Sequence, residues 1–290
     1  MPPFVLLDDA RPGGAAPRLY RDPVAVVAAW DPGEVGGVLD RLRAGAGQGL
    51  HAAGFLAYEA GEAFEPGVGR LSPAGMPLAW FGLFEEWEPV DLASWLPDPA
   101  GGWTGAPVPR VERARYEADV AEALRLIAAG DLYLVNLRFR ADVRVAGDPL
   151  AVYAGLRARA GAGYGAVVAT GRDMILSLSP ELFFRLDGDR LTARPMKGTA
   201  RRGQTPAADA ALARDLAADP KSQAENLMIV DLTRNDLSRV AAGGSVAVPE
   251  LFRVESYPTV HQLTSAVTAA LRPGLDAADV LAAAFPCGSI

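Results

Sequence analysis

The sequence predicts an α+β fold, with antiparallel sheets flanked by helices. Several runs of alternating residues follow one another through short turns, and the helical segments between them begin and end at typical capping residues. Strands and helices do not alternate in the strict order of a parallel sheet. With 290 residues, half of them hydrophobic, the chain is long enough to bury a sizeable core.

The first part of the chain is predicted to be a separate N-terminal region. Residues 1–88 mix short apolar runs with Gly and Pro. Residues 89–109 (PVDLASWLPDPAGGWTGAPVP) are rich in Pro, Gly and small residues and have no sustained periodicity, which is typical of a linker. We therefore predict a domain boundary there and a second domain over residues 110–290.

A helix and then a long strand are predicted to open the second domain. Apolar residues from Tyr116 to Ile127 recur at helical spacing, and Gly130 follows as a C-terminal stop. Residues 132–145 alternate strictly, which predicts a half-buried strand. Its apolar face would carry Tyr133, Val135, Leu137, Phe139, Ala141, Val143 and Val145.

Residues 165–196 predict an antiparallel meander of four strands. Each strand pair encloses a turn of Gly and Asp residues: 166–170 and 174–179 around Gly171-Arg172-Asp173, and 181–186 and 190–196 around Asp187-Gly188-Asp189.

The remaining elements have clear boundaries. Asp219-Pro220 is an N-cap followed by proline at the first helical position, and this helix extends through Leu237. Residues 245–256 predict two short strands broken by Pro249, and residues 260–271 predict a longer one. Asp276 begins a last helix that ends at Phe285-Pro286.

Composition and charge exclude several classes of function. The net charge is −7 without a Lys/Arg-rich run, which argues against nucleic-acid binding. A small anionic substrate stays open, because a few cations in a pocket can bind it. With Cys287 as the single cysteine and two histidines, His51 and His261, a Cys/His zinc site is close to excluded, whereas magnesium held by carboxylates is not.

The chain is expected to be cytoplasmic. No run approaches the roughly 20 apolar residues that span a bilayer. The N-terminus, Met1-Pro2-Pro3-Phe4, lacks the basic start of a signal peptide, and one cysteine cannot form an internal disulfide.

Four positions are candidates for chemistry. Lys197 lies in RPMKGTARRG, where Gly198 leaves room for a ligand; a solvated basic turn is the commoner explanation. Glu225 shares a predicted helix face with Ile229 and Leu232, and a buried carboxylate needs a partner or a metal. Equally, Glu225 could lie at the solvated edge near the helix N-terminus.

The other two candidates are weaker by themselves. His261 lies on the apparently inward face of the strand 260–271, where a histidine is more often a hydrogen-bonded core residue than an acid, although its ordinary pKa suits proton transfer. Glu181, in Ser179-Pro180-Glu181, is a carboxylate at a strand junction.

Together these positions lie in six ordered segments that resemble the chorismate-binding enzyme family, which includes anthranilate, aminodeoxychorismate, isochorismate and salicylate synthases. The resemblance extends from about residue 110 to the end of the chain and, more loosely, to PFVLLDDA and GFLAYEAGEAFEP near the N-terminus. The segments are GDLYLVNLRFR (130–140), SLSPELFFRL (177–186), RPMKGTARRG (194–203), AENLMIVDLTRNDLSRV (224–240), SYPTVHQLTSAV (256–267) and FPCGSI (285–290).

Lys197 makes the chain most similar to the aminodeoxychorismate synthases within this family, because most other members carry a small residue there. The resemblance implies that the Lys197 amine attacks C2 of chorismate and expels the C4 hydroxyl, after which ammonia adds at C4. It also implies that Glu181 is a general acid/base and that His261 assists proton transfer to the departing hydroxyl.

The resemblance further implies a substrate-binding set and a metal. Thr199, Arg201 and Arg202 would contact the substrate, and the backbone at Gly288 and Ser289 would bind a carboxylate. Glu225 would be a ligand of Mg²⁺. A separate glutaminase subunit would supply ammonia.

Two observations qualify this expectation. Leu134 replaces the lysine by which isochorismate and salicylate synthases activate water, and also the glutamine usual in aminodeoxychorismate synthases. The family's chains continue beyond the loop in which Ile290 lies, so we expect this polypeptide to be truncated and inactive or barely active by itself. The alternatives are an anthranilate synthase and a non-catalytic fragment that binds chorismate or the glutaminase.

Overall fold

The computed structural model describes residues 1–65, 67 and 75–289, which form two compact units. One unit contains residues 1–95 and 156–289, and the other contains residues 96–155. The chain passes from the larger unit to the smaller one after Trp95, and residues 1–95 belong to the same unit as residues 156–289. No helix of the described residues is long and apolar enough to cross a membrane.

The first sheet joins the two sequence segments of this larger unit, residues 1–95 and 156–289. Strand β1 pairs with β11 in antiparallel register, Val5 opposite Val168, although the two lie far apart in the sequence. Val5 and Leu6 are fully buried. The sheet order is β12 (Met174–Ser179), β11 (Tyr164–Ala169), β1 (Phe4–Asp8), β2 (Arg18–Arg21) and β6 (Glu88–Pro89).

A second, three-stranded sheet is covered by helix α1 (Pro32–Gly47). A capping box between Asp31 and Glu34 begins this helix. Its buried Val35 and Val38 pack against Val27 and Leu83 of the sheet. The strands are β3 (Ala25–Ala29), β5 (Ala79–Phe84) and β4 (His51–Leu56), with the short helices η1 (Tyr58–Ala63) and α2 (Leu92–Trp95) nearby in the sequence.

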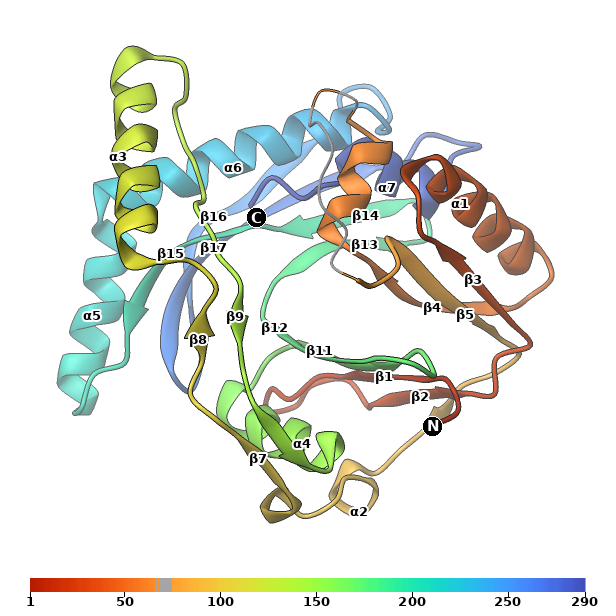
Figure 1. Ribbon diagram of the computed structural model, residues 1–290. Coiled ribbons are helices and arrows are strands. Elements are labelled where there is room, and N and C mark those ends of the chain that lie inside the picture. The colour runs from red at the N-terminus through yellow and green to blue at the C-terminus, as the bar shows by residue number, and fades with distance from the viewer. Residues whose placement is uncertain (66, 68–74, 290) are drawn as a thin grey trace. The chain divides into compact units, whose positions relative to one another are not determined.

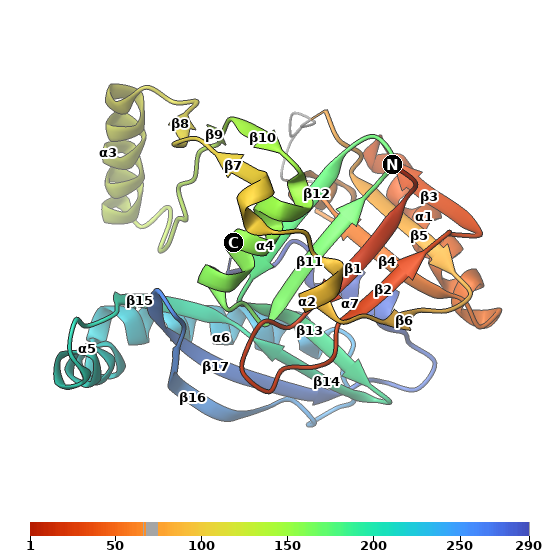
Figure 2. The ribbon, with the colours of Figure 1, turned by 90° about the horizontal axis from the view of Figure 1, so that it is seen from below.

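The third sheet carries most of the predicted site. Helix α6 runs along it and contacts β15 and β17 (Figures 1 and 2). The core between them contains Leu191, Val267, Val230 and Leu237. The elements are β13 (Leu182–Asp187), β14 (Arg190–Arg194), β15 (Met196–Arg201), β16 (Ala247–Ser256) and β17 (Val260–Ala270), with helices α5 (Pro206–Ala218), α6 (Pro220–Ser238) and α7 (Ala277–Ala284).

The predicted meander is confirmed as two strand pairs, β11 with β12 and β13 with β14, but the pairs belong to different sheets. The change of sheet occurs at Pro180, between β12 and β13. Proline lacks the N–H that a continuing ladder needs, so a strand end at this residue is physically reasonable. Residues 247–256 form one strand, interrupted by register shifts, where two were predicted.

The smaller unit confirms one prediction and contradicts another. Helix α3 (Arg113–Ala129) ends at Gly130, whose φ is +83°. The predicted strand over 132–145 is wrong: only β9 (Ala141–Asp142) and β10 (Val145–Gly147) form there, and they pair with β8 (Val108–Pro109) and β7 (Gly102–Thr104). Alternation makes a strand possible, but a long strand also needs an equally long partner. Helices η3 (Pro99–Gly101) and α4 (Pro149–Ala160) complete the described elements.

Candidate functional site

Strands β14 and β15 lie along one edge of β17 in a single register. Ala193 is opposite Val267, and Met196 is opposite Thr264. Between the two strands, the carbonyl of Pro195 accepts a hydrogen bond from the N–H of Ser265 at 3.2 Å. The segment thus continues past Pro195, and this continuity places Met196 and Lys197 beside the middle of β17.

Lys197 lies in a β-bulge. The register shifts between Met196 and Thr199, so Lys197 and Gly198 together face the single residue Leu263. Gly198 has a φ of +101°, a conformation that glycine adopts without strain. The Lys197 side chain is partly buried. The glycine predicted to leave room beside the lysine is therefore required by the backbone conformation itself.

Glu181 is brought to the same place from the start of β13. Its Oε1 accepts a hydrogen bond from the N–H of Met196 at 3.1 Å. Burial raises the pKa of the Glu181 carboxyl, and hydrogen bonds from Ser289 and Met196 together with the charge of Lys197 partly offset this effect. Glu181 is thus hydrogen-bonded to Ser289 and to the backbone of Met196, and the charge of Lys197 acts on its carboxyl.

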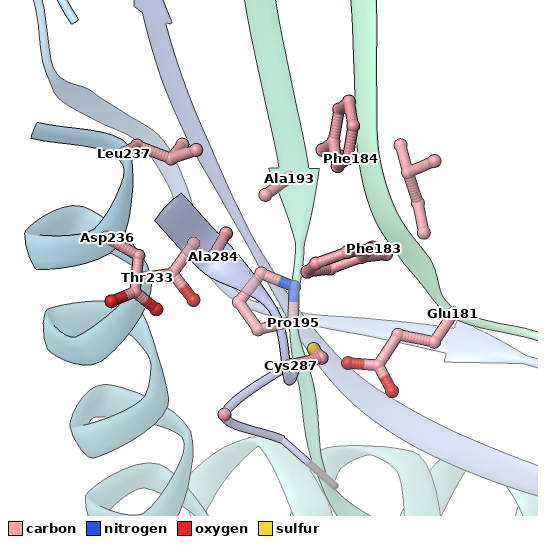
Figure 3. Close-up of a pocket in the computed structure, with 12 residues that line it drawn as sticks. Glu181, Phe183, Phe184, Ala193, Pro195, Thr233, Asp236, Leu237, Ala284 and Cys287 are labelled. Carbon is pink, nitrogen blue, oxygen red and sulfur yellow. The ribbon is translucent and has the colours of Figure 1, made fainter. Parts of the chain in front are cut away.

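Glu181 also borders a small pocket between the sheet and helix α6 (Figure 3). The cavity is about 20 Å³, which is room for about one water molecule, so it cannot enclose a six-membered ring by itself. Its lining residues are Glu181, Leu182, Phe183, Phe184, Ala193, Pro195, Thr233, Asp236, Leu237, Ala284, Cys287 and Gly288.

Two further ionisable groups of this pocket are shifted by burial. Desolvation raises the pKa of Asp236 to about 6, with a smaller opposing effect from the charge of Arg239. Burial likewise raises the pKa of the Cys287 thiol, whose Sγ is 3.2 Å from Oγ of Ser289. The pocket therefore favours the neutral form of its acids.

Gly288, predicted with Ser289 to hold a substrate carboxylate, lines this pocket, and Ser289 follows it in the sequence. A Cβ on Gly288 would lie 2.2 Å from Cδ2 of Leu232, so any larger residue there would require the end of the Leu232 side chain to move. Ser289 is buried. Ile290 lies outside the described residues.

His261 and Arg202 lie in a different network, centred on Asp209 of helix α5. His261 is 1% exposed; its Nδ1 is 2.8 Å from Oγ of Ser256 and its Nε2 is 3.0 Å from Oδ1 of Asp209. Arg202 donates to both oxygens of Asp209 at 2.7 and 2.6 Å. This is the hydrogen-bonded core position considered for His261 as the alternative, and the roles in proton transfer and substrate binding stay predictions for His261 and Arg202.

The remaining predicted residues are more accessible. Thr199 is exposed and its hydroxyl donates to Oε1 of Gln262 at 3.0 Å, while Arg201 is also exposed. The buried positions of α6 are Asn226, Ile229, Val230 and Leu237. The buried face of this helix therefore contains Asn226 in place of its neighbour Glu225, which was predicted to share a face with Ile229 and Leu232.

Glu225 is partly exposed and forms an ion pair with Lys221, Oε1 to Nζ 2.9 Å. In the part of the chain that the structure describes, no group of three or more His, Cys, Asp or Glu side chains is arranged to hold a metal ion. A carboxylate oxygen suits Mg²⁺, but Mg²⁺ needs several oxygen ligands. The donor set is therefore incomplete, and we derive no chemical step through a metal.

Comparison with known proteins identifies the fold and the family. The profile of the chorismate binding enzyme family matches residues 88–290. The chain belongs to this family. Aminodeoxychorismate synthase component 1 of Klebsiella aerogenes is 45% identical over 180 residues, which are 62% of this chain and 40% of that protein. Aminodeoxychorismate synthase of Streptomyces griseus is 45% identical over 188 residues, 64% of this chain and 26% of that protein.

More distant members of the chorismate-binding family have other names. Anthranilate synthase component 1 of Methanothermobacter thermautotrophicus is 39% identical over 178 residues, 61% of this chain and 38% of that protein. The crystal structure of anthranilate synthase component I from Streptococcus pneumoniae superposes with a TM-score of 0.77 at 25% identity, covering 93% of this chain and 72% of that one. The chain matches about two fifths of the length of the component 1 relatives.

Three residues of the candidate site and its surroundings were missed from the sequence. Neither Asp236 nor Asp209 was considered. Asn226 is fully buried and donates to the carbonyl of Lys197 at 3.3 Å. The sequence contained an indication that Asn226 is buried and hydrogen-bonded. Asn226 occupies a position of the apolar stripe that continues through Ile229 and Val230, and an amide at such a position needs hydrogen-bond partners.

Proposed function

We propose that this chain takes part in the amination of chorismate to 4-amino-4-deoxychorismate, with Lys197 as nucleophile. The observation that carries the proposal is a lysine at a bulge of the family's matched region, next to the buried carboxyl of Glu181. Relatives named aminodeoxychorismate synthase are the more similar ones at 45% identity, against 39% for the anthranilate synthase mentioned above.

The proposed reaction has two balanced steps. The neutral amine of Lys197 attacks C2 of chorismate and loses a proton, both ring double bonds shift by one position (C1=C2 to C1=C6 and C5=C6 to C4=C5), and the C4 hydroxyl leaves as water after it receives a proton. Ammonia then adds at C4 and loses a proton, both double bonds shift back, and the lysine nitrogen accepts a proton and leaves C2 as the amine. We assign the proton exchange to Glu181, because burial raises the pKa of its carboxyl and so favours its protonated form more than in an ordinary glutamate.

The partner and the metal are part of this proposal. The name component 1 belongs to the relatives and implies a second component. We infer that a glutaminase subunit supplies the ammonia here as well. Glu225 is our candidate Mg²⁺ ligand, and the cytoplasmic location stays a prediction from the sequence.

A covalent adduct tests Lys197 directly, because the chain contains only two lysines, Lys197 and Lys221. Incubation with chorismate and Mg²⁺, without ammonia, should add the mass of chorismate less one water at Lys197. Mass spectrometry detects one event per chain, so the test does not depend on turnover. Lys197→Ala should abolish the adduct, and the matched Lys221→Ala variant should keep it.

Two outcomes would contradict the proposal. An adduct that persists in Lys197→Ala, or the absence of any adduct on the unaltered chain, would remove the nucleophile. Formation of anthranilate and pyruvate from chorismate and ammonia would instead identify an anthranilate synthase.

A further inference from the structure

Three strands pair with β17, and two of them, β15 and β16, have bulges. On β15, Lys197 and Gly198 face Leu263 alone. On β16, the register shift between Glu250 and Arg253 leaves Leu251 and Phe252 opposite Ser265 alone, and Phe252 has a φ of +56°. A bulge leaves backbone groups without their usual partners in the ladder, so other groups must satisfy them.

Two fully buried side chains, Asn226 and Ser265, connect these bulges. The N–H of Phe252 donates to Oγ of Ser265 at 3.1 Å, and this hydroxyl donates to Oδ1 of Asn226 at 2.6 Å. The Nδ2 of Asn226 donates to the carbonyls of Leu263 at 3.0 Å and Lys197 at 3.3 Å. Because Ser265 gives its proton to the amide oxygen, it orients the amide so that both amide hydrogens face the bulge.

Helix α6 meets the bulge at a second point, one turn before Asn226. A Cβ on Gly198 would lie 2.8 Å from Cβ of Ser222, closer than Cβ atoms approach one another. Ser222 and Asn226 are four residues apart and therefore lie on the same face of α6. The helix thus supports the Lys197–Gly198 backbone by close packing and by a hydrogen bond.

We propose that Asn226 is a positioning residue for Lys197. Its amide, oriented by Ser265, fixes the carbonyl of Lys197 and with it the backbone position from which the lysine side chain extends. The importance of this for catalysis rests on the function proposed for Lys197. The positioning itself can be measured without chorismate, from the reactivity of the Lys197 amine. A network that only stabilised the core would leave this reactivity unchanged.

The variant that tests the proposal is Ser265→Ala, and Thr264→Val is its matched control. Both remove a buried hydroxyl from neighbouring residues of β17, but the Thr264 hydroxyl donates to the carbonyl of Arg253 at 3.2 Å and to Oε1 of Glu255 at 3.4 Å rather than to Asn226. Asn226→Asp is a second variant with nearly the same shape and no amide donor.

The two lysines make the measurement specific. Incorporation of [1-¹³C]lysine gives two backbone carbonyl signals in NMR, and trinitrobenzenesulfonate labels the two side-chain amines at rates that peptide mass spectrometry separates. Ser265→Ala and Asn226→Asp should shift the Lys197 carbonyl signal. They should change the ratio of Lys197 to Lys221 labelling by about threefold or more, the effect of one net hydrogen bond. Thr264→Val should leave both unchanged.

An unchanged labelling ratio in both Ser265→Ala and Asn226→Asp would overturn the positioning role, as would an equal change in Thr264→Val. These results are independent of the chorismate adduct. If the labelling ratio changes as expected but the unaltered chain forms no adduct, the proposed function fails and the positioning role stands. If the adduct forms equally fast in every variant, positioning by Asn226 has no part in the reaction.

Discussion

Replacing Gly198 by alanine should destabilise the protein for two separate reasons. Its φ of +101° is a conformation that residues with a Cβ rarely adopt. The added Cβ would also lie 2.8 Å from Cβ of Ser222 and 3.2 Å from Cβ of Leu263. Both neighbours are close to the backbone of packed elements, so neither can move away as a flexible side-chain end would.

The magnitude follows from adding these two costs. A non-glycine residue in a sparsely populated backbone conformation costs about 1–3 kcal/mol. Overpacking in a well-packed site costs about 1–3 kcal/mol more. We therefore expect Gly198→Ala to lower the free energy of unfolding by about 2–6 kcal/mol, a large part of the roughly 5–15 kcal/mol typical of proteins.

Urea unfolding followed by tryptophan fluorescence measures this change, and Gly188→Ala is its control. Gly188 also has a positive φ, +63°, but a Cβ there would meet nothing within 4 Å. Gly188→Ala should therefore show the conformational cost alone. Adding Ser222→Gly to Gly198→Ala should recover part of the packing cost. Equal unfolding midpoints for Gly198→Ala and Gly188→Ala would refute the close approach of α6 to the bulge.

Two further predictions concern pH. Burial raises the pKa of Asp236 to about 6, so the folded protein favours the protonated carboxyl, and the stability that this form contributes is full below pH 3.8 and is lost as the pH rises through 6. Asp236→Asn should therefore be more stable than the unaltered protein at pH 7.5 but not at pH 4. Urea unfolding midpoints measured at both pH values check this. Hydrogen bonding from Arg202 holds the pKa of Asp209 well below its usual range, so this contribution is present above pH 3.8 and lost in stronger acid. Asp209→Asn should lower the melting temperature at pH 7 by more than at pH 3, and a pH-independent decrease would contradict the assignment.

Structural features that depend on neighbouring residues could be predicted from the sequence. Helix α6 begins at the predicted Asp219-Pro220, and helix α3 ends at the predicted Gly130, because capping depends on neighbouring residues. The pairing of β1 with β11 could not be predicted. No local pattern records which distant strand lies alongside another, and residues 1–88 therefore looked like a separate region.

The candidate site likewise has features that could be predicted from the sequence and features that could not. Lys197 and Glu181 come together because short segments of one sheet carry both, so recognising the segments sufficed. For His261, the alternation of its strand correctly predicted an inward face. It could not reveal that the partner on that face is a carboxylate from α5, Asp209, which occupies Nε2. Both ring nitrogens of His261 are thus engaged, one by Ser256 and the other by Asp209, and only the tertiary structure shows these partners.

The bulge at Lys197 shows why a residue pattern alone does not fix the position of a reactive side chain. Before the bulge, β14 and β15 keep one register with β17; after it, every residue is displaced by one position, and Thr199 lies opposite Gln262. Such a shift exchanges the faces on which side chains lie. Periodicity read through residues 190–201 therefore assigns Lys197 no reliable direction. The contacts of Asn226 and Ser222 with the bulge supply that direction, and they come from a helix that begins about twenty residues later in the sequence.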